Sequence, residues 1–140
     1  MIIKSFKIFE MTVTDLSNEI DDFLLYFQDE GYQIENRYRY GGGIGIWRNH
    51  HPSEHSDGKS IFKKISDDFF RLVDYLLSHL RKVVINVEMI VEKKSNRFNI
   101  IGYDTPSIGF IIHRGEKDWE DRLLKDIGEN TKIRSISIEI

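Results

Sequence analysis

The most constraining feature of this sequence is a succession of two apolar periodicities. In three stretches, bulky apolar residues recur three and four positions apart, which is the spacing of one helical face. In other stretches apolar and polar residues alternate, which is typical of a strand with one buried side. The alternation is clearest at the C-terminus, where Ile136, Ile138 and Ile140 are separated by Ser137 and Glu139. The two periods predict a protein that contains both helices and a sheet.

The first period predicts three helices. Gly31 and Gly128 are expected to end the first and the third, because glycine readily adopts the left-handed conformation found at helix ends. The second follows a polar loop over residues 49–58, and acidic residues from Glu116 onward favour the start of the third. The predicted buried stripes are Leu16, Ile20, Phe23, Leu24 and Phe27; Phe62, Ile65, Phe69, Leu72, Leu76 and Leu80; and Trp119, Leu123 and Ile127.

The second period predicts seven strands. The first ten residues carry apolar side chains on both faces of an extended chain, with Phe6 and Ile8 on one face and Ile3 and Phe9 on the other. The other predicted strands lie around residues 32–40, 44–46, 85–91, 98–100, 108–112 and 135–140, with turns at Gly41-Gly42-Gly43, Lys94-Ser95-Asn96 and Thr105-Pro106-Ser107. The expected order is therefore β-α-β-β-α-β-β-β-α-β.

This order predicts a two-layer α+β sandwich. Short turns join neighbouring strands, so the sheet is expected to be mostly antiparallel, with the three helices packed on one face. The regular helix and strand alternation of a Rossmann-type fold is absent. No repeat or linker rich in Pro, Gly or Ser divides the chain, so residues 1–140 are expected to form a single domain.

Composition excludes several classes of function. The chain has no cysteine, which rules out disulfides, cysteine-bound zinc and thiol nucleophiles. A net charge of −3 argues against a dedicated nucleic-acid binder. No apolar run reaches the roughly 18 residues of a membrane span, and the first residues lack a signal-peptide pattern. We therefore expect a cytoplasmic protein that does not contact a membrane.

No complete catalytic motif occurs in the sequence. Gly58-Lys59-Ser60 before a helix matches the end of a phosphate-binding loop, but the glycine required five positions earlier is Ser53. Asp21-Asp22 and Asp67-Asp68 are consecutive helix positions and do not face each other. The sequence also lacks a Gly-x-Ser-x-Gly serine elbow. These observations favour a non-enzymatic protein and imply no cofactor.

A histidine-rich loop is the candidate metal site. His50, His51 and His55, together with Asp57, provide the donor types of a transition-metal site. No His-Glu-x-x-His helix accompanies them, and exposed loops tolerate histidine freely. A metal-dependent hydrolase that uses this loop is the third functional hypothesis, and an exposed loop without metal is the alternative.

The predicted hairpin over residues 37–48 is the candidate ligand site. Strand alternation places Arg37 and Arg39 on one face, and Trp47 can join them from the partner strand, with Tyr40 and Arg48 nearby. Guanidinium groups can hold phosphates while an aromatic ring stacks on a base. The hairpin therefore predicts a site for a small anionic ligand such as a nucleotide.

Local charge agrees with such a site but leaves an alternative open. Residues 31–64 hold 6 basic and 3 acidic groups, whereas residues 1–30 hold 2 basic and 7 acidic groups. In the alternative interpretation the hairpin faces solvent, and its arginines pair with Glu35 or with the acidic first helix.

Parts of the first eighty residues resemble a known class of proteins. The relevant stretches are Lys4-Ser5-Phe6-Lys7-Ile8-Phe9-Glu10, Asp29-Glu30-Gly31-Tyr32 and Asp67-Asp68-Phe69-Phe70-Arg71-Leu72. They are similar to small accessory proteins of large tailed bacteriophages. The presence of 21 Ile and no Ala, which indicates AT-rich coding, agrees with this resemblance. It implies a phage origin and a place in the host cytoplasm, and it carries over no site residues.

Two functions of different classes follow from these observations. The first is a non-enzymatic accessory protein that binds a host or viral macromolecule, through a sheet face or through the Arg/Tyr hairpin. The second is a small-ligand protein that binds or sequesters a nucleotide at the hairpin. An antiparallel sheet leaves strand edges to be covered, and self-association is a common solution. A homodimer is therefore expected.

Overall fold

Groups of strands separated by helices make up the described part of the chain, which covers residues 13–48, 61–94 and 101–140 of a computed structural model. It contains three α-helices and a sheet, so the predicted α+β class is confirmed. In chain order the elements are α2 (Val13–Asp29), β1 (Gln33–Asn36), the 3-10 helix η1 (Tyr38–Tyr40), β2 (Ile44–Trp47), α3 (Phe62–His79), β3 (Lys82–Lys94), β4 (Ile101–Asp104), β5 (Ser107–His113), α4 (Trp119–Ile127) and β6 (Lys132–Glu139).

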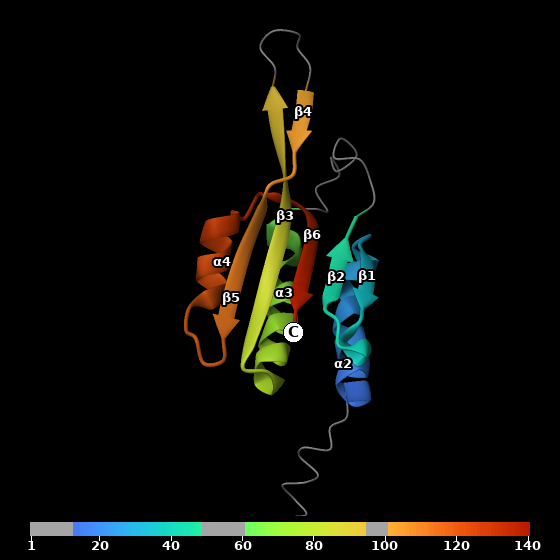
Figure 1. The fold of residues 1–140 in the computed structure, drawn as a ribbon. Helices are drawn as coiled ribbons and strands as arrows, with labels where there is room; N and C mark the ends of the chain where they lie inside the picture. Colours follow the sequence, from blue (N-terminus) through green and yellow to red (C-terminus); the bar gives the residue numbers. More distant parts are fainter. Residues whose placement is uncertain (1–12, 49–60, 95–100) are drawn as a thin grey trace, which may run out of the picture.

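The six strands form one sheet around the long central strand β3 (Figure 1). The order is β1-β2-β6-β3-β4, and β5 also pairs with β3. All of these pairings are antiparallel, as predicted. The C-terminal strand β6 therefore lies between β2 and β3 and joins the N-terminal hairpin to the rest of the sheet.

Strands β4 and β5 behave as one strand interrupted at Pro106. Glu88 pairs with Ser107 and Val91 with Asp104, which is the same register continued along β3. Pro106 lacks the N–H that a ladder needs, but its carbonyl still accepts from Met89 N at 2.9 Å. Beyond Ile90, which still pairs with Lys132 of β6, β3 pairs with β4 alone and forms a two-stranded arm that extends past the helices (Figure 1).

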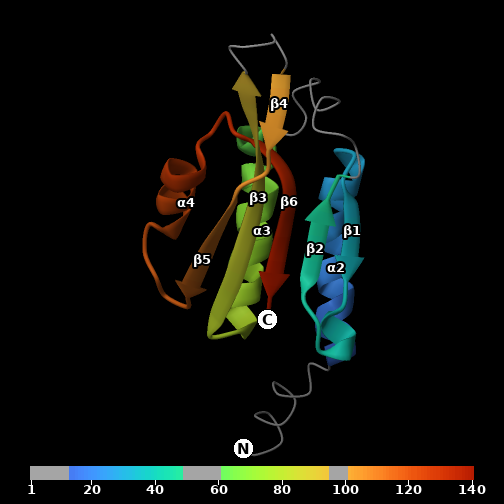
Figure 2. The ribbon, with the colours of Figure 1, turned by 45° about the horizontal axis from the view of Figure 1, so that its top comes forward.

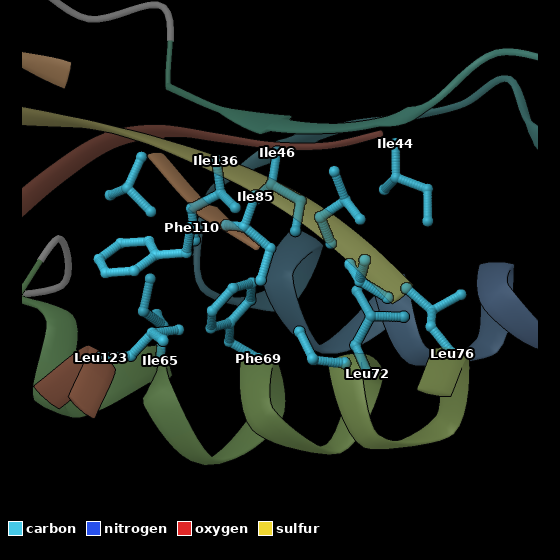
Figure 3. Close-up of a cluster of buried hydrophobic side chains, with 14 of the residues drawn as sticks. Ile44, Ile46, Ile65, Phe69, Leu72, Leu76, Ile85, Phe110, Leu123 and Ile136 are labelled. Carbon is cyan, nitrogen blue, oxygen red and sulfur yellow. The ribbon is translucent and has the colours of Figure 1, made fainter. Parts of the chain in front are cut away.

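The three α-helices lie on the same side of the sheet (Figures 1 and 2). Side chains from β2, β3 and β6 meet the apolar stripe of α3 in the layer between sheet and helix (Figure 3). The predicted stripes are buried, apart from Phe23 and Leu80, which are half-buried. The fully buried residues that fill this layer include Ile44, Ile46, Ile65, Phe69, Leu72, Leu76, Ile85 and Ile138.

Two helices end at glycines, and a third is capped by a distant arginine. Gly31 and Gly128 have φ of 89° and 94° and end α2 and α4 as predicted. The C-terminal end of α3 is capped from a distance, because Arg114 Nε donates to the carbonyls of Leu77 at 2.8 Å and Leu80 at 3.1 Å. These two hydrogen bonds connect the end of α3 to the turn that follows β5.

The observed order differs from the predicted one at its start. The first described element is helix α2, and the strand predicted over the first ten residues lies outside the described residues. The turn Lys94-Ser95-Asn96 and the strand residues Phe98 and Ile100 fall largely outside them as well. None of the described helices is long and apolar enough to cross a membrane.

Three predicted boundaries were wrong. The strand expected over residues 32–40 ends at Asn36, and η1 follows it. Helix α4 begins at Trp119, after a turn that includes Asp118 at φ 61°. Strand β6 ends at Glu139, which pairs with Val84, and Ile140 beyond it is 38% exposed.

Asn36 explains why β1 ends early. Its Nδ2 donates to the Ser17 carbonyl and to Asp21 Oδ1, both at 2.9 Å, while its Oδ1 accepts from Tyr38 N at 3.0 Å. These bonds fasten the strand end to α2 and turn the chain into η1. The alternation of the sequence beyond Asn36 therefore does not continue as a strand.

Candidate functional site

The face of the sheet opposite the helices is not covered by any described element, and we call it the open face. Strand pairing aligns its residues in rows across five strands. One row is Gln33, Trp47, Ser135, Glu88 and Ser107. The next row is Glu35, Gly45, Ser137, Asn86 and Gly109. The second row is made mostly of small side chains, so the middle of the open face is low and accessible.

Trp47 is the large aromatic residue of these two rows. Its ring lies along β2 over Gly45, since a Cβ built on Gly45 would be 3.2 Å from Trp47 Cζ3. The side chain is half-buried. A flat aromatic ring beside small residues is a suitable anchor for a protein partner.

Charges on the open face occur in opposite pairs. Arg37 Nε lies 2.5 Å from Glu35 Oε1, and Arg134 Nη1 lies 3.5 Å from Glu88 Oε1. Arg134 is the extra residue of a β-bulge, because Ser135 pairs with Glu88 while Ile133 pairs with Met89. The open face therefore has no strong field of one sign that would select a polyanion.

The five residues of the candidate ligand site lie in two separate groups. Arg37, Arg39 and Tyr40 are at the turn of the hairpin, where Arg39 Nη2 donates to Asn18 Oδ1 at 3.1 Å and Tyr40 is 84% exposed. Trp47 lies at the other end of β2, where it pairs with Gln33. It is three positions from Ile44, which begins β2 next to the turn, and this spacing is about 10 Å along the strand. The Trp47 ring and Glu35, the partner of Arg37, both border Gly45. The ligand-binding role of these residues stays a prediction.

Arg48 has a structural environment that the sequence did not indicate. The side chain is 8% exposed, and its guanidinium carbon lies 5.4 Å from the centre of the Tyr32 ring. Tyr32 is itself buried and donates to the Ile133 carbonyl at 3.2 Å, while Arg48 N donates to the Arg134 carbonyl at 3.0 Å. An arginine at a strand end normally reaches into solvent, so only the tertiary contact with Tyr32 reveals this position.

Acidic and histidine residues do not form a metal site in the described part of the chain. No group of three His, Asp or Glu side chains there has the geometry to hold an ion. The candidate metal residues His50, His51, His55 and Asp57 lie outside the described residues.

Surface hollows do not coincide with the candidate ligand residues. Four hollows lined by described residues have volumes of about 260 to 360 Å³. None of these four includes Arg37, Arg39 or Trp47. The largest, about 360 Å³, lies at the base of the β3–β4 arm and is lined in part by Ile90, Val91 and Tyr103.

Sequence reasoning missed the small residues of the open face. Gly45, Asn86, Gly109, Ser135 and Ser137 occupy the polar positions of predicted strands, and that polarity was the available signal. Which of them lie side by side depends on pairing between distant segments. Comparisons with known proteins add no assignment, because no family model, no curated protein and no solved structure matches this chain.

Proposed function

We propose that this protein is a non-enzymatic accessory protein that binds a protein partner through the open face of its sheet. The observation that carries the proposal is the five-strand surface left uncovered by the helices, with Trp47 at one side and small residues beside it. The resemblance of the first eighty residues to phage accessory proteins supports a phage origin.

The size of the open face limits how the partner binds. The four residues each of β1 and β2, the longer β5 and β6 and the part of β3 that pairs with β6 amount to about 30 residues. At about 3.3 Å per residue and about 4.8 Å between strands, they give roughly 500 Å² of flat surface. A specific interface usually buries about 800 Å² on each partner. The partner is therefore expected to extend beyond the two central rows, onto the sheet edges or the β3–β4 arm.

The chemistry of the open face favours protein over small ligands or nucleic acid. Paired charges and small side chains permit close approach of another backbone, and Trp47 supplies the large apolar contact typical of interface centres. A nucleotide site would need convergent cations, and the arginines of this face are engaged by Glu35 and Glu88.

Affinity capture with matched variants tests this function. Wild-type protein, Ser137→Arg and the control Ser78→Arg on the exposed side of α3 are immobilised and exposed to a bacterial lysate. A captured protein is then purified and titrated against each variant by calorimetry. The proposal expects saturable binding to wild type and to Ser78→Arg, and at least tenfold weaker binding to Ser137→Arg.

Three results would overturn the proposal. The first is binding that Ser137→Arg and Trp47→Ala leave unchanged. The second is evidence for the small-ligand alternative, namely a thermal shift of several degrees with a mono-, di- or cyclic nucleotide that disappears in Arg37→Ala. Turnover of nucleotides, phosphodiesters or esters by purified protein would likewise exclude a purely binding role.

A further inference from the structure

Strand β5 has a free outer edge within the described part of the chain, where it pairs with β3 alone. Backbone bonds from Met89 N to Pro106 O and from Arg114 N to Arg81 O, at 2.9 and 2.8 Å, bracket its pairing with β3. Backbone groups in an antiparallel pair point alternately toward the partner and away from it. The residues of β5 whose backbone groups point outward are therefore Ser107, Gly109, Ile111 and His113.

Strand β5 itself lacks three features that often protect a strand edge from association. β5 contains no proline, no lysine and no bulge, and Ile111 is 51% exposed. The sheet edge at β1 has only four residues, against seven in β5. The Arg122 side chain reaches the β5 edge, where its Nη2 donates to the Ile111 carbonyl at 3.2 Å.

Helix α4 flanks the edge (Figures 1 and 2). Two oppositely charged residues of this helix, Arg122 and Asp126, lie along the edge. A hollow of about 260 Å³ between them is lined by residues 108–111, Arg122 and Asp126. Arg122 and Asp126 are four residues apart, or about 6 Å along the helix. Ile111 and Gly109 are two residues apart, or about 7 Å along the strand. Arg122 therefore lies level with Ile111, and Asp126 lies level with Gly109.

A second copy of this chain matches the edge in backbone, shape and charge. We place a twofold axis through Phe110, the middle residue of β5. Each outward-pointing backbone group of one copy then faces an outward-pointing group of the other copy in antiparallel register. Gly109 then lies opposite the partner's Ile111, and the open space above Gly109 receives the exposed isoleucine side chain. The same axis brings Asp126 level with the partner's Arg122, so two opposite-charge pairs form across it.

We propose that β5 is the interface of a homodimer, in which two copies join edge to edge into one continuous antiparallel sheet with Arg122–Asp126 pairs across the twofold axis. In the single chain Arg122 covers the Ile111 carbonyl and pairs with Glu116 at 3.1 Å. On dimerisation the partner's Gly109 N–H takes that carbonyl, and Arg122 turns to the partner's Asp126. The Ile111 carbonyl is therefore hydrogen-bonded in both states.

The joined sheet also places the two open faces side by side. A partner that carries two copies of a binding site could then contact both faces at once. Such a partner would bind the dimer more tightly than it binds a single face. The dimer itself does not rest on the proposed function. Its interface is the backbone edge of β5 together with α4, and of the two rows on the open face it shares only the β5 residues Ser107 and Gly109.

Charge reversal with rescue tests the interface in the full-length chain. Light scattering across a concentration series is expected to give twice the chain mass of 16.6 kDa for wild type. Arg122→Glu and Asp126→Lys each place like charges together across the axis and should weaken the dimer at least tenfold. The double variant restores opposite charges and should recover most of the dimer. The matched control Arg71→Glu, at an exposed position of α3, should leave the mass unchanged.

Gly109→Pro provides an independent test of the strand edge. Its N–H points away from β3, so proline removes an inter-copy bond without breaking the internal ladder. Circular dichroism verifies that the variant folds, and the folded variant should be monomeric. A wild type that is monomeric at every measured concentration would overturn the proposal. So would a dimer that persists in both Arg122→Glu and Gly109→Pro, or a double charge variant that fails to recover.

Discussion

The burial of Phe69 provides the most direct test of how α3 joins the sheet. Its side chain is fully buried and lies in the layer between α3 and the strands (Figure 3). Removing a buried phenylalanine side chain costs about 3–5 kcal/mol. The neighbours of Phe69 along the buried stripe, Ile65 and Leu72, are fixed on the same helix, so the space cannot close easily. We expect Phe69→Ala to lose about 4 kcal/mol of unfolding free energy.

Urea denaturation followed by circular dichroism measures this loss. For a chain of this size the denaturant slope is about 2 kcal/mol/M, so the midpoint should fall by about 2 M. The adjacent Phe70 provides the control, because it is half-buried and meets the Trp119 ring edge-on at 5.3 Å. Phe70→Ala should cost about half as much. A loss below about 1.5 kcal/mol for Phe69→Ala, or a larger loss for Phe70→Ala, would refute the stated packing of α3.

Three further perturbations test other parts of the structure. Gly43→Ala places a Cβ against the Ile138 carbonyl, and unfolding experiments should show a loss of about 2 kcal/mol or more, since backbone cannot move aside cheaply. Arg48→Ala removes the guanidinium from the Tyr32 ring and should lose about 1–2 kcal/mol by the same assay. The Asp104 carboxylate raises the pKa of Lys93 above its ordinary 10.5, so the favourable pair is present below that pH and is lost as pH rises past the folded pKa. In Asp104→Asn, NMR titration should show the Lys93 pKa lowered.

Matched controls accompany these variants. Gly102→Ala has no backbone atom closer than 3.8 Å to the new Cβ and should change stability little. Arg39→Ala removes an exposed arginine and should cost less than about 0.5 kcal/mol. If Gly102→Ala loses as much unfolding free energy as Gly43→Ala, the close approach at Gly43 is refuted. If Arg39→Ala loses as much as Arg48→Ala, the buried contact of Arg48 is refuted. If the Lys93 pKa stays unchanged in Asp104→Asn, the ion pair does not form in solution.

Sequence alone determined the elements whose signals are local. The stripe from Phe62 to Leu76 predicted α3 and its buried face, and Gly31 and Gly128 marked two helix ends, because each signal depends on residues within a few turns. The alternation in β6 likewise separated buried isoleucines from outward polar residues, whereas one outward position of β5 is the exposed Ile111. From these patterns the α+β class and the antiparallel sheet followed.

Only the tertiary structure decided which segments lie together. The ties from Asn36 to α2 end β1 before Arg37, and no local pattern near Asn36 records them. The insertion of β6 between β2 and β3 sets Ser137 beside Gly45 and Asn86, which creates the open face from three distant segments. Arg48 is buried because Tyr32 lies under it. These features depend on pairing and packing between residues far apart in the chain, and a local periodicity contains no information about which distant partner a residue will meet.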